Sequence, residues 1–194
     1  MLVSDGAPEN VDAHLARLGT SVAELYGCEL PGDLEERIAA AAAAQPLGRL
    51  RVLVGEGGRL VEVQTTPLES DPEPRLAALA PVCLPGGLGP HKWRDRRLLE
   101  ELEERLGALP LIMDSDGEVL EAASANVFIV EEATLVTPPL DGRLLPGTVR
   151  ARVLAAAPSV GVSASEEPIT LERLAAADEI VPAIDVALMR RLLG

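Results

Sequence analysis

The residue with the most distinctive chemistry in this chain is Lys92, which lies in the segment GPHKWRDRRLL at residues 89–99. The 17 lysine and arginine residues of the chain are 16 arginines and this one lysine. Arginine forms surface ion pairs at least as well as lysine, whereas only a lysine amine can lose its proton and attack a carbonyl carbon as a nucleophile. A compositional bias toward arginine accounts for a single lysine equally well, so the neighbouring motifs must decide.

Four further polar features lie where a packed core would not require them. Glu121 belongs to the expected strand EVLEAASANVFIV, and Asn126 comes just before the apolar end of that strand. The segment LPGTVR predicts a helix that starts at 147–149, where backbone N–H groups suit a phosphate. Arg17, in an expected helix, could supply a second phosphate contact. Each feature alone has an ordinary explanation as a strand, turn, helix-start or surface residue.

Taken together, these features match the requirements of one cofactor. An amine can form a Schiff base, a carboxylate can keep a ring nitrogen protonated, and a helix N-terminus can bind a phosphate. Pyridoxal 5'-phosphate (PLP) needs all three from the protein that holds it.

Five sequence blocks, in order, resemble the class-IV (fold-type IV) PLP-dependent aminotransferases. They are AHLARLGTSVAELYG, HKWRDR, DSDGEVLEAASANVFIV, LVTPPLDGRLLPGTVR and LAAADEI. Within this family the chain is most similar to 4-amino-4-deoxychorismate lyase, and the similarity extends from about residue 5 to about residue 180.

The resemblance implies a role for each candidate residue. Lys92 would bind the cofactor covalently and then move the substrate proton. Glu121 would pair with the pyridine nitrogen, and Asn126 would give structural support. The cofactor-binding residues implied for the phosphate are Arg17, Gly147, Thr148 and Val149, the last three through the backbone of the helix start.

The resemblance also implies the fold, an α+β (two-lobed α/β) architecture like that of D-amino-acid aminotransferase, with a truncated N-terminal small lobe. The alternation of short strands and helices independently predicts two small α/β or α+β lobes. We expect a small lobe at residues 1–84, a linker at 85–90 within the glycine- and proline-rich CLPGGLGP, and a larger lobe at 91–194 that carries the lysine.

Hydrophobic spacing and capping residues predict the individual elements. In the first lobe they are a helix from Val11 to about Gly27, a helix that follows a capping box of Asp33 and Glu36, a hairpin at 49–66 and a loop at 69–75. In the second lobe they are a helix at 93–107 with Lys92 just ahead of it or in its first turn, strands at 108–114, 118–131 and 133–140, and helices at 147–157 and 171–179.

The chain departs from the family pattern at several places. Arg97 stands where branched-chain enzymes have a tyrosine, and HKWRDR fits the lyase pattern better. Thr148 and Val149 replace the usual Ile-Thr pair, a change that backbone contacts would tolerate. Asp185 lies near the position of a phosphate-contacting threonine or asparagine, where a carboxylate would repel phosphate. A strand with the pattern G-x-F-E-T is expected to be missing before residue 1.

Composition limits the classes of function. The formal net charge of -14 and the pI near 4.5 disfavour binding to nucleic acid or to an anionic membrane surface. Cys28 and Cys83 are expected to be reduced thiols, and two histidines leave little material for a metal site. The start of the chain has no signal-peptide pattern, so we expect a cytoplasmic protein.

We therefore expect a PLP-dependent enzyme that acts on a small amino-acid-like substrate, with no nucleic-acid or membrane partner, as a homodimer. Its reaction would be either the release of pyruvate and 4-aminobenzoate from aminodeoxychorismate, for folate synthesis, or transamination of branched-chain or D-amino acids. The alternative is a catalytically inactive family member that serves as a binding or dimerisation module.

Overall fold

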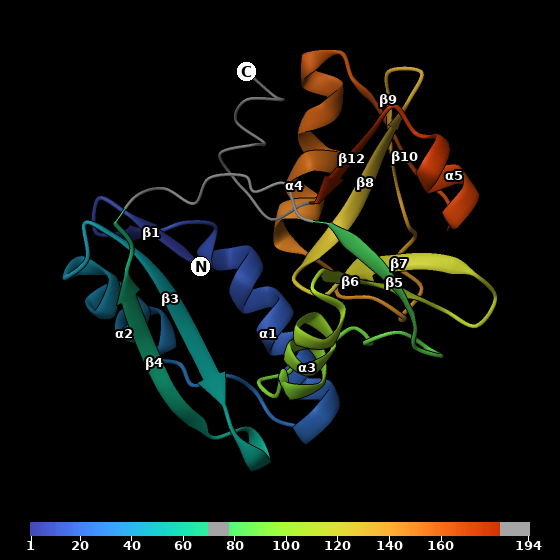
Figure 1. Cartoon of the computed structure of the whole chain (residues 1–194). Coiled ribbons are helices and arrows are strands. Elements are labelled where there is room, and N and C mark those ends of the chain that lie inside the picture. The colour runs from blue at the N-terminus through green and yellow to red at the C-terminus, as the bar shows by residue number, and fades with distance from the viewer. Residues whose placement is uncertain (70–77, 183–194) are drawn as a thin grey trace. The chain divides into compact units, whose positions relative to one another are not determined.

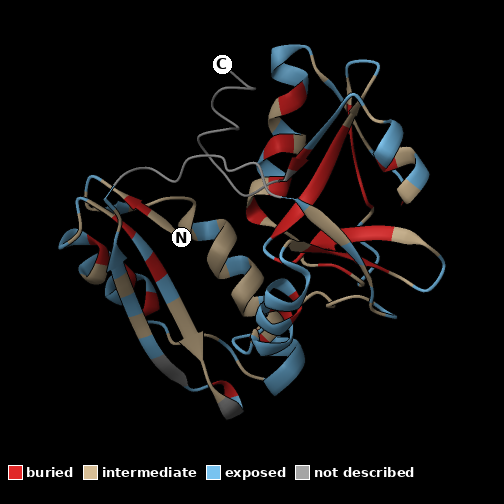
Figure 2. Cartoon of the chain, viewed as in Figure 1, coloured by how far each residue is buried: buried red, intermediate tan, exposed pale blue. Residues whose placement is uncertain are grey.

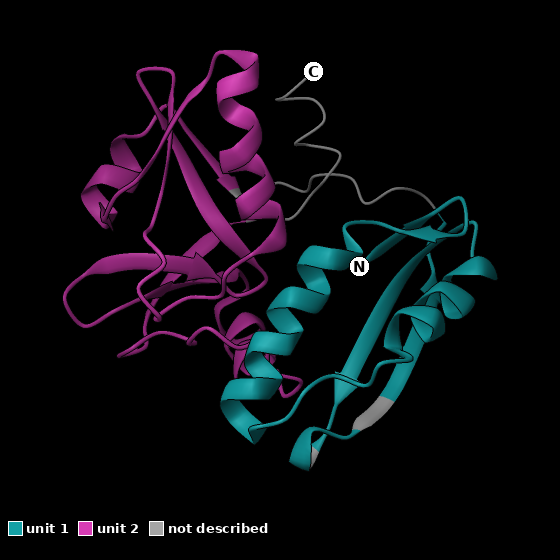
Figure 3. Cartoon of the chain, turned by 180° about the vertical axis from the view of Figure 1, so that it is seen from behind, with its two compact units in different colours: residues 1–72 teal, residues 73–194 magenta. Residues whose placement is uncertain are grey.

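The chain forms two compact units, Met1–Pro72 and Glu73–Gly194, in a computed structural model that describes residues 1–69 and 78–182 (Figures 1 and 3). The boundary comes before the predicted linker at 85–90, because strand β5 (Leu79–Cys83) pairs in parallel with β6 (Leu109–Met113) and so belongs to the second unit. Asp185 and all but the first residue of the predicted loop at 69–75 lie outside the described residues.

The first unit is a four-stranded sheet with two helices. Its strands are arranged in the order β2-β1-β3-β4, and all neighbouring pairs are antiparallel. The elements are β1 (Leu2–Ser4), β2 (Ala7–Pro8), α1 (Val11–Tyr26), α2 (Leu34–Ala43), β3 (Leu47–Val54), a short 3-10 turn η1 (Glu56–Gly58) and β4 (Leu60–Pro67). Leu34 and Ile38 of α2 are buried with Val3 and Leu50 of the sheet, which makes the aliphatic core of this unit (Figure 2). The predicted hairpin is confirmed as β3 and β4.

The first helix ends as the sequence predicts, and the second begins differently. At the end of α1, Gly27 adopts a left-handed φ of 66°, and its N–H donates to the Ala23 carbonyl over 2.9 Å. The α2 helix follows Asp33, but the Asp33 side chain makes no capping hydrogen bond, so the predicted capping box is wrong. The Asp33 backbone carbonyl instead accepts the N–H of Arg37 at 3.1 Å.

The second unit is built on an eight-stranded sheet. Its main path runs β10-β9-β8-β7-β6-β5, with β11 paired to β7 and β12 paired to β8. The remaining elements are α3 (Arg97–Leu106), β7 (Glu118–Ala122), β8 (Ala125–Glu131), β9 (Thr134–Thr137), α4 (Thr148–Ala156), the 3-10 turn η2 (Ala157–Val160), β10 (Ser163–Glu166), β11 (Ile169–Thr170), α5 (Leu171–Ala176) and β12 (Glu179–Pro182). Strands mixed with helices in both units confirm the predicted α+β fold class.

Three predicted elements in this unit need correction. The segment 118–131 is two strands rather than one, because the small residues Ala123 and Ser124 form a tight turn between β7 and β8. Helix α3 begins at Arg97 instead of residue 93, since the Asp95 carboxylate accepts the Arg97 N–H at 3.1 Å and holds residues 91–96 in an irregular conformation. Lys92 therefore lies five residues ahead of the helix, and α5 is shorter than the predicted helix at 171–179.

A cluster of buried side chains supports the turn between β7 and β8. Leu120 and Ala123 of this hairpin pack with Ile112 of β6, Leu99 of α3 and Leu144 of the loop before α4. Figure 2 shows that the strands of this unit hold most of its buried residues. The strands, α3 and the loop before α4 are thus fixed to one another by aliphatic packing, which positions the polar residues described next.

Candidate active site

Glu121 and Asn126 face each other across the β7–β8 hairpin. The register pairs Glu121 with Asn126 and Ala122 with Ala125, so both polar side chains lie on the same face of the sheet. Both are buried, with 4% and 5% of their surfaces exposed. A buried carboxyl and a buried amide must find hydrogen-bond partners within the protein.

The backbone of Leu145 supplies partners for both of these side chains. The Leu145 N–H donates to Oε1 of Glu121 at 3.1 Å, and the Leu145 carbonyl accepts from Nδ2 of Asn126 at 2.9 Å. One loop residue is therefore held from two strands at once. The contact agrees with the structural role expected of Asn126, whereas sequence reasoning missed Leu145, because a backbone donor leaves no signal in residue type.

Gly147, Thr148 and Val149 form the start of α4, where the sequence predicted a helix. Gly147 is the N-cap residue and Thr148 is the first helical residue, with 8% of its surface exposed. A Cβ atom at Gly147 would lie 1.9 Å from Oδ1 of Asn126, so a side chain cannot fit there without displacement of the Asn126 amide. The backbone of the helix start is therefore packed closely against the β7–β8 hairpin. Phosphate binding by this helix start stays a prediction.

Two cations in the segment before α3 act on the Glu121 carboxyl. Burial raises the pKa of Glu121 from 4.5 to about 7, and the Leu145 N–H and the charges of Lys92 and Arg96 lower it less than burial raises it. Lys92 is exposed to solvent, and Arg96 donates from Nη2 to the Ala123 carbonyl at 2.5 Å. The structure thus brings Lys92 and Glu121 into one electrostatic neighbourhood. Arg96 was not singled out from the sequence, although it lies four residues after Lys92 in HKWRDR.

The other two arginines considered from the sequence have different surroundings. Arg97 is exposed and forms an ion pair with Asp95, which lowers the pKa of Asp95 to about 2. Arg17 lies on α1 in the first unit and is partly buried. Its proposed contact with a phosphate stays a prediction.

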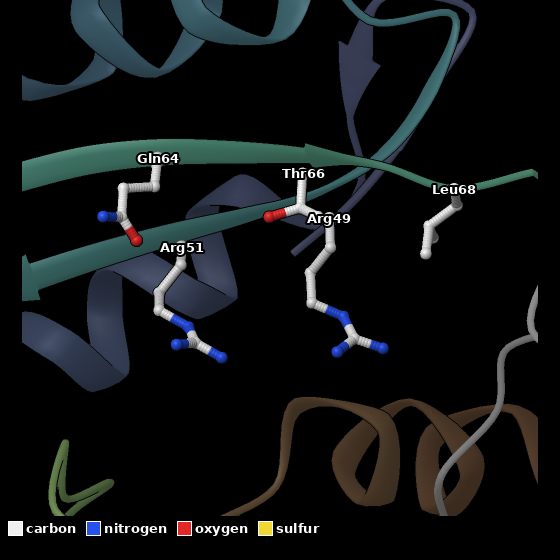
Figure 4. Close-up of a pocket in the computed structure, with 5 residues that line it drawn as sticks. All are labelled: Arg49, Arg51, Gln64, Thr66 and Leu68. Carbon is white, nitrogen blue, oxygen red and sulfur yellow. The ribbon is translucent and has the colours of Figure 1, made fainter.

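The first unit has a small hollow on its sheet. It has a volume of about 120 Å³ and is lined by Arg49, Arg51, Gln64, Thr66 and Leu68 (Figure 4). Arg49 pairs across the strands with Thr66, and Arg51 with Gln64, so two guanidinium groups follow one another on one face of β3. The lining has two positively charged arginine side chains and no carboxylate, so the hollow is better suited to an anion than to a cation.

Neither a metal cluster nor a membrane span is found in the part of the chain that the structure describes. No three histidine, cysteine, aspartate or glutamate side chains among residues 1–69 and 78–182 are grouped so that they could hold a metal ion. Within the same ranges, every helix is too short or too polar to cross a bilayer.

A comparison with known families places the chain. The family model described as amino-transferase class IV matches residues 1–182. The chain therefore belongs to the class-IV aminotransferase family, which confirms the resemblance seen in the sequence.

The curated relatives with significant similarity include branched-chain-amino-acid aminotransferases. The Escherichia coli K12 enzyme is 33% identical over 70 residues, which is 36% of this chain and 23% of the relative. Branched-chain-amino-acid aminotransferase 5, chloroplastic, from Arabidopsis thaliana is 37% identical over 60 residues, or 31% of this chain and 14% of the relative. The matched segment thus spans less than a quarter of the length of either protein.

Solved structures resemble the chain over most of its length. A hypothetical aminotransferase from Mycobacterium tuberculosis in its PLP-bound form has a TM-score of 0.79 at 22% identity, covering 94% of this chain and 75% of that one. A fold IV-transaminase from Curtobacterium pusillum gives 0.74 at 22%, covering 95% and 72%. A Haemophilus somnus protein assigned as a 4-amino-4-deoxychorismate lyase gives 0.73 at 26%, covering 95% and 93%. The predicted fold-type IV architecture is confirmed.

The raised pKa of Glu121 predicts a specific dependence of stability on pH. The folded protein holds the Glu121 proton up to a pH of about 7, whereas the unfolded chain releases it near 4.5. Between these values the folded state binds more protons, so the free energy of unfolding falls as pH rises. We expect Glu121→Gln, which does not titrate, to gain stability relative to the wild type over this window by up to about 3 kcal/mol. Urea unfolding of both proteins without cofactor, from pH 4 to 9, measures this difference. A constant difference across the window would contradict the assignment.

The close approach at Gly147 predicts a large effect of a single methyl group. Gly147→Ala forces the Asn126 amide away from the helix start, and we expect it to cost about 1–3 kcal/mol of unfolding free energy. Gly32→Ala is the matched control, because a Cβ atom there would meet nothing within 4 Å. Urea unfolding of the two variants provides the measurement. Equal midpoints for both would show that the contact between Gly147 and Asn126 is not tight.

Proposed function

We propose that this chain is a PLP-dependent enzyme in which Lys92 binds the cofactor and Glu121 holds its ring nitrogen. The observation that carries the proposal is the buried Glu121 carboxyl, whose pKa is raised to about 7 although Lys92 and Arg96 face it. The interactions of the Glu121 carboxylate with the protein do not fully replace the hydration that the charged group loses on burial. A protonated pyridine nitrogen would donate a hydrogen bond and a positive charge to it, so the carboxyl fits this cofactor.

The start of α4 fits the phosphate group of the same cofactor. The helix has nine residues, and its first turn contains no acidic side chain that would repel an anion. Gly147 leaves no space for a side chain beside Asn126. We therefore assign phosphate binding to the backbone of Gly147, Thr148 and Val149, with Asn126 as the residue that supports this backbone.

Lys92, Glu121 and Arg96 would each have a separate role in the proposed reaction. When bound, PLP supplies an electron sink that stabilises negative charge on the carbon next to the substrate amine. The Lys92 amine takes the proton from that carbon, and its exposed position allows it to reach a bound ligand. Glu121 keeps the proton on the ring nitrogen. Arg96, anchored on the Ala123 carbonyl, keeps a permanent positive charge beside Glu121.

For the reaction itself we propose the lyase outcome. Loss of the α-proton and of the enolpyruvyl group converts aminodeoxychorismate to aromatic 4-aminobenzoate, and the departing enolpyruvate takes up a proton to become pyruvate. Arg97 in the place of the branched-chain tyrosine supports this reading, as does the similarity to the Haemophilus somnus protein over 93% of its length. Transamination is the second candidate, because the similar curated proteins carry branched-chain aminotransferase names.

An inactive binding module is the third candidate function. The proximity of Lys92 and Arg96 to Glu121 supports catalysis over it.

The family uses PLP and acts on amino-acid substrates, and no helix in the described residues spans a membrane. A homodimer and a cytoplasmic location remain predictions from the sequence.

The single lysine makes covalent binding of the cofactor unusually easy to test. The second primary amine in this sequence is the amino group of Met1, which donates to the Leu50 carbonyl at 2.7 Å. We expect purified protein with PLP to absorb visible light and, after borohydride reduction, to carry the label on the peptide that contains Lys92. Lys92→Arg keeps the positive charge but has no amine that can react, so it should lose both signals. Label on the N-terminal peptide, or no label at saturating PLP, would refute the assignment of Lys92.

Product analysis separates the lyase from the transaminase. With aminodeoxychorismate and no added keto acid, we expect equal amounts of pyruvate and 4-aminobenzoate, and none from Lys92→Arg. We expect Glu121→Gln to keep much of the PLP affinity and to lose most turnover, at least about 100-fold, since it cannot hold the ring proton. Exchange of amino groups between amino acids and 2-oxoglutarate without pyruvate release would establish the transaminase and exclude the lyase.

A further inference from the structure

Arg143 contacts each of the segments that carry the proposed catalytic groups of the second unit. These segments are the loop at 84–92 that leads to Lys92, the turn and strand at 114–122 that carry Glu121, and the loop at 138–147 to which Arg143 itself belongs. Arg143 lies two residues before Leu145, the donor to Glu121. It does not reach Glu121 through any hydrogen bond of its own side chain that the structure describes.

The guanidinium group of Arg143 binds four carboxylates. The closest nitrogen–oxygen distances are 3.0 Å to Asp114, 3.3 Å to Asp116, 2.5 Å to Glu118 and 2.6 Å to Asp141. Three of these acids, Asp114, Asp116 and Glu118, lie in the turn before β7 and at its first residue. Hydrogen bonds to Asp141, Glu118 and Asp114 raise the pKa of Arg143 further above its usual range. The side chain is only 24% exposed, so this network ties the loop at 138–147 to the strand that carries Glu121.

The backbone of Arg143 ties the same loop to the lysine segment. Its carbonyl accepts the Gly89 N–H at 3.0 Å, three residues before Lys92. Gly87, in the same segment, has a left-handed φ of 68°, and a Cβ atom there would lie 2.1 Å from the Arg143 carbonyl oxygen. Asp114, which binds the Arg143 guanidinium, also accepts the Gly86 N–H at 3.0 Å. The two connections converge on residues 86–89.

We propose that Arg143 is a positioning residue that holds the Leu145 N–H on Glu121 and sets the loop that carries Lys92. It would not touch substrate or cofactor. The catalytic meaning of this role rests on the proposed function, but the effect on Glu121 exists in the protein without cofactor. An arginine is required because its planar fork presents five donors in fixed directions, whereas a lysine ammonium acts as a point charge that cannot bridge four acids with the same geometry.

Arg143→Lys is the sharpest variant, because it keeps the charge and changes the geometry. The Leu145 N–H stabilises the charged form of Glu121, and a loosened loop weakens this bond. The other charged groups that face Glu121, Lys92 and Arg96, are unchanged in the variant. We therefore expect the pH dependence of stability caused by Glu121 to move upward, by about half a pH unit or more.

The matched control is Arg173→Lys. Arg173 is also partly buried, at 28%, and binds two carboxylates, Glu131 and Glu167, in the same unit. It has no described contact with the segments at 84–92 or 138–147, so a general loss of stability would appear in this variant without any shift for Glu121.

The experiment measures urea unfolding from pH 4 to 9 without PLP for the wild type, Arg143→Lys and Arg173→Lys, each with Glu121 and with Gln at 121. The difference within each pair reports the titration of Glu121 in that background. An upward shift only in the Arg143→Lys pair supports the proposal. Equal midpoints in all three pairs overturn it, and so does an equal shift in the Arg173→Lys pair.

Two further readouts keep this result separate from the proposed function. If Arg143→Lys is too unstable for urea titration, carbon-13 NMR of the glutamate carboxyls in the folded protein gives the Glu121 pKa directly, with Glu121→Gln for assignment. Failure of PLP to bind the wild type would refute the proposed function and leave these measurements intact. If PLP binds, we expect Arg143→Lys to lower kcat at least about tenfold more than it changes KM, because it disturbs the groups that act on the proton.

Discussion

The constraint on which the second unit depends is the burial of one carboxyl group. Glu121 is 4% exposed on β7, between Ile112 of β6 and Asn126 of β8, and burial raises its pKa to about 7. A carboxyl in this setting needs an oriented donor on one side and positive charge on another. The Leu145 N–H is the donor, and Lys92 with Arg96 supplies the charge. These interactions with Glu121 hold the loop before α4 and the segment before α3 in place.

Small residues make these positions possible. The turn between β7 and β8 uses Ala123 and Ser124, which brings Asn126 opposite Glu121 in a register that a longer loop would not fix. Gly147 and Gly87 leave room where two backbone segments meet a side chain amide and a carbonyl oxygen. Small residues at these positions are thus a packing requirement, and larger side chains, among them Ile112, Leu120 and Leu144, pack with Ala123 in one buried cluster.

Much of this arrangement could be predicted from local sequence, and the failures have a common physical cause. The amphipathic α1 helix and the β3–β4 hairpin follow from periodicity and turn residues, which act within a few positions. The sequence patterns merged β7 with β8, predicted a start of α3 four residues too early and gave no prediction of β1, β2, β5 or β10–β12. Those features depend on pairing between distant segments or on a single side chain such as Asp95. Likewise, Lys92 and Glu121 could be found in the sequence by their residue types. Leu145 could not, because it acts through its backbone. Arg96 and Arg143 are two of many arginines, and only their contacts in the structure distinguish them.

The proposed role of Lys92 accounts for the presence of both Lys92 and Arg96 within one short segment. Arg96 holds a permanent charge near Glu121 and is fixed to the Ala123 carbonyl by a directional hydrogen bond, a task for which a guanidinium is well suited. If residue 92 were needed only for a second charge, arginine would perform that task in a chain that uses it at every other basic position. What lysine adds is an amine that can lose its proton, and Lys92 is exposed to solvent. In the proposed site, a fixed cation, Arg96, and a lysine amine that can react, Lys92, are therefore separate groups four residues apart, which an ion pair alone would not require.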